Sequence, residues 1–159
     1  MKKILILLLT IFGIVSFSEN VDIVIKNATV LTMDAKKTVI ENGVVAIKNN
    51  AIVEVGNGEL LSKYKGKKTI DAENDIVMPG FINTHTHVSM VAFRSLADDV
   101  PDRLSRYIFP LENKLVSRDL VYKGAVYGIL EMVSTGTTTF ADMYYFEDEV
   151  AKAAELIGV

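Results

Sequence analysis

The chain contains no cysteine, no tryptophan and only two histidines in its 159 residues. The absence of cysteine excludes disulfide bonds, thiolate metal sites, cysteine nucleophiles and a lipid-modified N-terminal cysteine. The 17 Lys and Arg nearly balance the 20 Asp and Glu, so we expect no nucleic acid as a partner, because such partners usually require a basic domain. Half of the residues are hydrophobic, which excludes a wholly disordered chain. Any histidine chemistry must therefore rely on His85 and His87 together.

Residues 1–18 have the layout of a secretory signal peptide. A lysine pair precedes an apolar run from Ile4 to Val15, and Ser16-Phe17-Ser18 then offers small residues two positions apart. The alternative is a membrane-spanning helix, but the run is shorter than the roughly 20 apolar residues that such a helix needs. We therefore expect an exported protein, periplasmic or secreted, with no stable membrane anchor.

Residues 19–78 read as a series of short strands. Turn signals separate them at Lys26–Ala28, at Glu41–Gly43 and at the pair Asn49-Asn50. Two consecutive asparagines accept positive φ and suit a tight hairpin. The expected strands are 21–25, 29–33, 44–47, 51–55, 68–71 and 75–78. This pattern predicts a small antiparallel sandwich or open barrel, and by itself it carries no chemistry.

From Pro79 onward the hydrophobic period changes, and the predicted elements alternate between strand and helix. We expect a strand at 81–87, a short helix at 102–109 between Pro101 and Pro110, a long helix capped by Ser117, a strand at 137–142 and a helix at 147–157. Gly136 and Gly158 stand where C-terminal helix caps belong. The alternation indicates an α/β domain with two parallel βα units over residues 79–159.

The chemistry concentrates at His85 and His87. Successive side chains of a strand point to opposite faces, so these two point to the same face, with their ring nitrogens close enough to share one ion. Neutral imidazole is a common zinc ligand. The alternative is a pair of strand histidines with satisfied hydrogen bonds. The pair lies near the carboxyl end of the first parallel strand, which is where barrel enzymes place their active sites.

The segment Val77–His87 closely resembles the first barrel strand of the metal-dependent amidohydrolase superfamily, and residues 19–78 resemble its N-terminal half-sandwich. Downstream, Phe93–Asp99, Phe109–Glu112 and Phe140–Tyr144 resemble the branch that contains the 5′-methylthioadenosine/S-adenosylhomocysteine deaminases and chlorohydrolase-like relatives. The resemblance implies an α/β fold: the N-terminal part of a TIM-like (β/α)8 barrel, with two βα units at 79–159, preceded by a small β-sandwich half at 19–78.

The resemblance also implies a hydrolase that acts on non-peptide C–N bonds and deaminates an aminopurine nucleoside as its small-molecule substrate. His85 and His87 would hold Zn2+ or another divalent transition metal, with a histidine and an aspartate from later strands, and the ion would activate a water molecule. Glu112 matches the family position that hydrogen-bonds the ribose hydroxyls. The alternative is that Glu112 is a solvated charge at the end of a helix. Asp142 would lie near the site with a structural role.

Two departures from the family pattern limit what the resemblance implies. No histidine follows His87, and a complete barrel needs about 250 residues, so later metal ligands are missing. We therefore expect the N-terminal fragment of an exported enzyme, inactive by itself. The alternatives are a non-catalytic metal-binding or interaction remnant, and one half of a split enzyme that a separate C-terminal half completes. Relatives often carry a tryptophan before the segment that matches Phe109–Glu112, and its absence here leaves the identity of the substrate open. Cytosine, guanine, chlorotriazine and imidazolone hydrolysis also stay open, because the residues that discriminate between these substrates lie on later strands.

Overall fold

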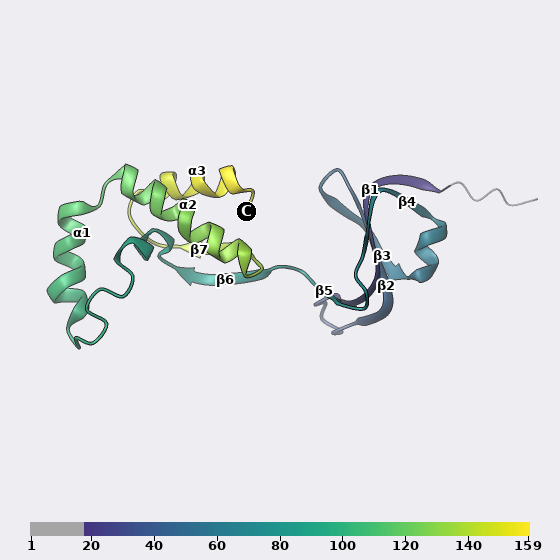
Figure 1. The fold of residues 1–159 in the computed structure, drawn as a ribbon, viewed down its shortest axis with the longest axis horizontal. Helices are drawn as coiled ribbons and strands as arrows, with labels where there is room; N and C mark the ends of the chain where they lie inside the picture. The colour runs from purple at the N-terminus through teal and green to yellow at the C-terminus, as the bar shows by residue number, and fades with distance from the viewer. Residues whose placement is uncertain (1–17) are drawn as a thin grey trace, which may run out of the picture. The chain divides into compact units, whose positions relative to one another are not determined.

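The computed structural model describes residues 18–159, so the expected signal peptide, apart from Ser18, lies outside the described residues. The chain divides into two compact units, one ending at Pro79 and the other spanning Gly80–Val159 (Figure 1). Within the described range, no helix has the length and apolar character needed to cross a membrane.

The first unit is built on one five-stranded sheet with the strand order β3-β2-β1-β4, in which the short β5 pairs with the end of β1. Its elements are β1 (Glu19–Leu31), β2 (Val39–Lys48), β3 (Ala51–Asn57), the 3-10 turn η1 (Gly58–Ser62), β4 (Tyr64–Asp71) and β5 (Ile76–Val77). The hairpin predicted at Asn49-Asn50 is confirmed, because β2 and β3 pair antiparallel and both asparagines have positive φ.

The expectation of a purely antiparallel sheet is wrong. The strands β4 and β5 both run parallel to β1, while β2 runs antiparallel to β1. Alternation of apolar residues reports which face of a strand is buried, but it does not report the direction of the strand. The connection through η1 returns the chain to the start of β1, so that β4 lies beside it in parallel register.

Two predicted turns of the first unit are also wrong, because each lies inside a strand. Lys26–Ala28 is an irregularity in β1, where Asn27 has a φ of 54° and its side-chain amide donates to both carboxylate oxygens of Asp71. Glu41–Gly43 belongs to β2 and lies opposite that irregularity. A Cβ on Gly43 would lie 2.6 Å from Cγ2 of Val30, so this glycine permits close strand contact rather than chain reversal.

The second unit contains a two-stranded parallel sheet and several helices, of which α2 packs against β7. Its elements are β6 (Phe81–Thr86), the 3-10 segment η2 (Val88–Phe93), the π-helical turn η3 (Leu104–Ile108), α1 (Phe109–Leu115), α2 (Arg118–Ser134), β7 (Thr137–Asp142) and α3 (Glu147–Ile157). The parallel pairing of β6 with β7, with α2 between them in the chain, confirms the predicted βαβ order (Figure 1).

The helix boundaries follow local capping chemistry. The Ser117 hydroxyl accepts a hydrogen bond from the Leu120 N–H at the start of α2, and Gly136 and Gly158 have positive φ after α2 and α3, as predicted. The predicted break at Pro110 is wrong, because η3 continues directly into α1 and Pro110 lies in the first turn of α1. Pro110 has no N–H and makes no hydrogen bond back into η3, yet the helical backbone continues through it.

The core of the second unit joins α2 to η2 and α3. Its fully buried members are Val88, Val121, Ala125, Ile129, Val150 and Ala153. The contact between α2 and η2 is made by backbone: a Cβ on Gly124 would lie 2.6 Å from the Ser89 carbonyl oxygen, and one on Gly128 would lie 2.8 Å from that of Val88. The buried Ser89 hydroxyl also donates to the carbonyl of Val121 at 2.9 Å. This close approach fixes the segment that directly follows the two histidines.

We predict that Gly124→Ala destabilises the chain, because the added methyl group would push the Ser89 backbone away from α2. Overpacking of this kind lowers the free energy of unfolding by about 1–3 kcal/mol. The better helix propensity of alanine offsets about 1 kcal/mol of that loss. Urea unfolding followed by circular dichroism measures the net loss of unfolding free energy. Leu130→Ala, at an exposed position of the same helix, is the control. A gain in stability of about 1 kcal/mol, which is what helix propensity alone would give, would contradict the close contact.

Candidate functional site

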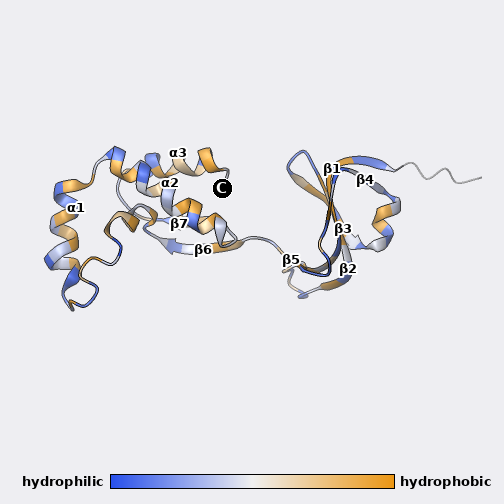
Figure 2. Cartoon of the chain, viewed as in Figure 1, coloured by the Kyte–Doolittle hydropathy of each residue, from blue (hydrophilic) through white to orange (hydrophobic). Residues whose placement is uncertain are grey.

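The candidate site lies at the carboxyl ends of the two parallel strands of the second unit. The strand β6 changes from apolar at Phe81 and Ile82 to polar at its end, as Figure 2 shows. In register, Thr86 near the end of β6 lies opposite Asp142, the last residue of β7. The loops after both strands therefore begin at the same edge.

The two histidine rings lie side by side at this edge. Their centroids are 4.9 Å apart, and the ring planes meet at 80°. His85 lies within β6, which ends at Thr86, one residue before the predicted end of the strand. His87 is therefore the first residue after β6. The close placement of the rings agrees with the alternation argument.

A backbone carbonyl orients the ring of His87. The Nδ1 atom of His87 is hydrogen-bonded to the carbonyl oxygen of Met143, in the loop after β7. A carbonyl oxygen only accepts, so Nδ1 must carry the hydrogen, and the lone pair of the neutral ring is then on Nε2. This is the arrangement in which metal-binding histidines are usually held.

The carboxylate of Glu112 is buried, with only 6% of the residue exposed, so a solvated charge at a helix end is excluded. Its Oε1 accepts a hydrogen bond of 2.8 Å from the hydroxyl of Tyr144, which follows β7. Burial, followed by this bond to Glu112, raises the pKa of the Tyr144 hydroxyl well above its ordinary value.

One cavity of about 470 Å3 joins Glu112 to His87. It lies within the second unit, and its lining residues are His87, Met90, Leu104, Phe109, Glu112, Met143, Tyr144 and Tyr145. The rings of His87 and Tyr144 are 6.2 Å apart. The structure therefore brings together two of the three predicted site residues, and the third, His85, contacts the ring of His87.

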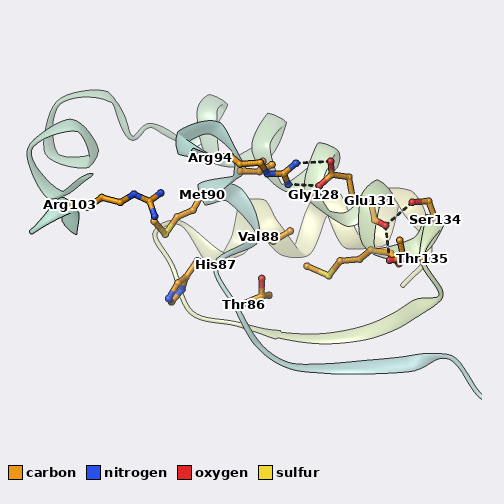
Figure 3. A pocket seen from close by; sticks show the side chains of 12 residues that line it. Thr86, His87, Val88, Met90, Arg94, Arg103, Gly128, Glu131, Ser134 and Thr135 are labelled. Carbon is orange, nitrogen blue, oxygen red and sulfur yellow. Dashed lines mark hydrogen bonds and ion pairs between the residues drawn. The ribbon is translucent and has the colours of Figure 1, made fainter. Parts of the chain in front are cut away.

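A larger and more open cleft of about 720 Å3 is also lined by His87 and lies against α2 (Figure 3). In it Arg94 points toward Glu131 and forms an ion pair with it, the two guanidinium nitrogens each facing a carboxylate oxygen. Both partners are largely exposed and neutralise each other. The smaller cavity is the better candidate, because it holds a buried carboxylate beside a histidine.

Asp142 lies between the two strand ends, and its carboxylate accepts hydrogen bonds from backbone N–H groups rather than facing the cavity. Among residues 18–159, no three His, Cys, Asp or Glu side chains are gathered closely enough to hold a metal ion. The described residues thus offer two neighbouring imidazoles and no third group beside them for a metal ion.

The sequence alone indicates no role for Tyr144 or for the carbonyl of Met143. Tyr144 belongs to the segment Phe140–Tyr144, but nothing in that pattern indicates that its hydroxyl reaches back to Glu112, 32 positions earlier. A backbone carbonyl leaves no trace in a sequence, so the partner of His87 Nδ1 could be found only from the fold.

Known proteins resemble this chain in both units. Residues 76–159 match the Amidohydrolase family. The chain is 46% identical over 140 residues to a 5′-deoxyadenosine deaminase of Methanosarcina barkeri, which covers 87% of this chain and 32% of that relative. It is 43% identical over 144 residues to the 5-methylthioadenosine/S-adenosylhomocysteine deaminase 1 of Syntrophus aciditrophicus. This match covers 89% of this chain and 32% of the relative. The chain thus spans about a third of the length of these relatives.

Solved structures give the same grouping. An adenosine deaminase of Xanthomonas campestris with bound zinc matches 89% of this chain and 33% of its own, with a TM-score of 0.84 and 30% identity. An atrazine chlorohydrolase of Arthrobacter aurescens in complex with zinc matches 86% of this chain and 34% of its own, with a TM-score of 0.69 and 25% identity. Fold, sequence match and relatives agree, and the chain belongs to the amidohydrolase family.

Proposed function

We propose that this chain provides the first part of a metal-dependent amidohydrolase that deaminates an aminopurine nucleoside. The observation that carries the proposal is the single cavity lined by His87 and by the buried carboxylate of Glu112. The names of the relatives support the choice of substrate, because the most similar of them in sequence are deaminases of adenosine-type nucleosides. Zinc bound in two of the similar structures supports the choice of metal.

The donor set fits a divalent transition metal. His85 and His87 present two imidazoles side by side, and the second has its Nδ1 occupied by a carbonyl, so that its Nε2 is free to bind. When bound, such an ion makes water nucleophilic near neutral pH. A catalytic zinc site usually has three protein ligands, so we propose that the remaining ligands come from a part of the protein beyond these residues.

Glu112 would bind the sugar of the nucleoside. A carboxylate can accept hydrogen bonds from two neighbouring hydroxyl groups, which suits a vicinal diol. Tyr144 donates to Oε1 of Glu112 and leaves Oε2 to receive a substrate hydroxyl. The aromatic and apolar side chains of Phe109, Tyr144 and Tyr145 line the same cavity and would exclude water around that contact.

The proposal includes the architecture and the location of the whole protein. The first unit would be a β-sandwich half and Gly80–Val159 the first two βα units of a TIM-like barrel, which the likeness to the Xanthomonas campestris enzyme supports. The composition of residues 1–18 supports export through a signal peptide. A non-catalytic remnant and one half of a split enzyme are the competing proposals.

We predict that the purified chain with zinc releases no ammonia above the blank from 5′-deoxyadenosine. Mixed with a C-terminal segment of the Methanosarcina barkeri relative that begins where the match to this chain ends, it is expected to release ammonia. His85→Ala and His87→Ala should each reduce that rate to the blank, because each removes an imidazole ligand. Thr84→Ala, in the same strand, is the matched control and should keep the rate.

Three outcomes would count against this account. Turnover by the chain alone would contradict an incomplete site. A complemented enzyme that releases chloride from a chlorotriazine but no ammonia from any aminopurine nucleoside would contradict the proposed substrate. Full activity of both histidine variants would contradict their role as ligands.

The hydrogen bond from Tyr144 to Glu112 makes the ionisation of Tyr144 depend on that carboxylate. Because the pKa of Tyr144 is raised, the neutral phenol stabilises the fold, and that contribution is complete at neutral pH and below. It is lost as the pH rises through the raised pKa. Glu112→Gln removes a negative charge beside the hydroxyl, so the pKa of Tyr144 should fall. The 13C chemical shift of the Tyr144 ring carbon that bears the hydroxyl, followed against pH, measures this change.

The matched control is Glu155→Gln, which removes one negative charge from the exposed surface of α3 and should leave the titration of Tyr144 unchanged. If Tyr144 ionises together with exposed tyrosines in the wild type, or if Glu112→Gln does not move its pKa, the buried contact does not exist in solution.

A further inference from the structure

The carboxylate of Asp142 connects the loops that follow β6 and β7. Its Oδ2 accepts a hydrogen bond of 3.0 Å from the N–H of Val88, the residue directly after His87. Its Oδ1 accepts a hydrogen bond of 2.7 Å from the N–H of Met143. The same N–H of Met143 also lies 3.2 Å from the carbonyl oxygen of Thr86. One side chain therefore holds the backbone on both sides of the contact between His87 and Met143.

The Val88 N–H is the first amide of η2, and the residue before it, His87, makes no capping hydrogen bond with its own side chain. Helix-terminal amides need an acceptor, and here β7 supplies it from a distant part of the sequence. The contacts of Ser89 with Val121 and Gly124 fix the next residue against α2. The packing of Ser89 against α2 thus fixes the backbone that follows His87, and the hydrogen bonds of Asp142 set the distance between His87 and Met143.

The carbonyl of Met143 in turn selects the protonation site of the His87 ring. The carbonyl can only accept, so it favours the tautomer with hydrogen on Nδ1 and the lone pair on Nε2. If Met143 moved away, neither ring nitrogen would have a fixed partner, and the ring would populate both neutral tautomers.

We propose that Asp142 is a positioning residue that fixes His87 in its Nδ1–H tautomer by holding Val88 and Met143 together. The purpose of this tautomer, which is to present Nε2 to a metal ion, rests on the proposed function. The tautomer itself exists without metal or substrate. A carboxylate suits this position, because each of its two oxygens accepts from one of the two N–H groups. An asparagine in its place has one acceptor oxygen and an NH2 group, which would face an N–H donor.

Nitrogen-15 NMR of the histidine rings tests the proposal on the full chain without metal. The sequence has only two histidines, so the spectrum contains two imidazole spin systems. At a pH high enough to keep both rings neutral, the wild type should show His87 as the Nδ1–H tautomer. Asp142→Asn should convert His87 to a mixture of the two tautomers. Asp99→Asn, the same change of charge at an exposed position, should have no effect.

Two results would overturn the inference: a wild-type His87 with hydrogen on Nε2, or a folded Asp142→Asn chain with an unchanged tautomer. A purely structural role would lower stability without altering the tautomer, so the second result separates the two roles. If Asp142→Asn does not fold, Asp142→Glu keeps both acceptor oxygens and should keep the Nδ1–H form. Loss of that form, with the Val88 and Met143 amides still protected from exchange, would also overturn it. Failure of the deaminase assay would leave this measurement unaffected.

Discussion

The candidate site depends on the parallel pairing of β6 with β7. Because the two strands run in the same direction, their carboxyl ends meet at one edge, and residues 56 positions apart in the sequence become neighbours. His87 then meets the carbonyl of Met143, and the buried Glu112 meets the hydroxyl of Tyr144. An antiparallel pairing would send the loop after β7 to the opposite edge, and neither contact would form.

Backbone contacts give this edge its fixed shape. Gly124 and Gly128 let α2 approach the residues after His87 so closely that no side chain could fit between them. Asp142 holds the same residues from the side of β7. Side chains that carry chemistry are thus supported by parts of the chain that carry none, which is the usual way to hold a ligand at a defined position.

The sequence predicts the second unit more accurately than the first. Strand β7 and helix α3 have the predicted bounds, because Gly136 and Gly158 mark their limits and the hydrophobic period is clear. In the first unit the same kind of signal misleads, since Asn27 and Gly43 serve irregular strand pairing rather than turns. The histidine pair follows from strand alternation, whereas the burial of Glu112 and its bond to Tyr144 depend on tertiary packing that no local pattern encodes.

We propose that His85 and His87 together bind a single divalent ion. Titration of the wild-type chain with Zn2+, followed by the ring nitrogen signals of both histidines, is the sharpest test of this shared site. If the site is shared, Nε2 of His87 and one ring nitrogen of His85 should shift along the same saturation curve. Shifts of only one histidine, or of the two at clearly different zinc concentrations, would contradict a shared site.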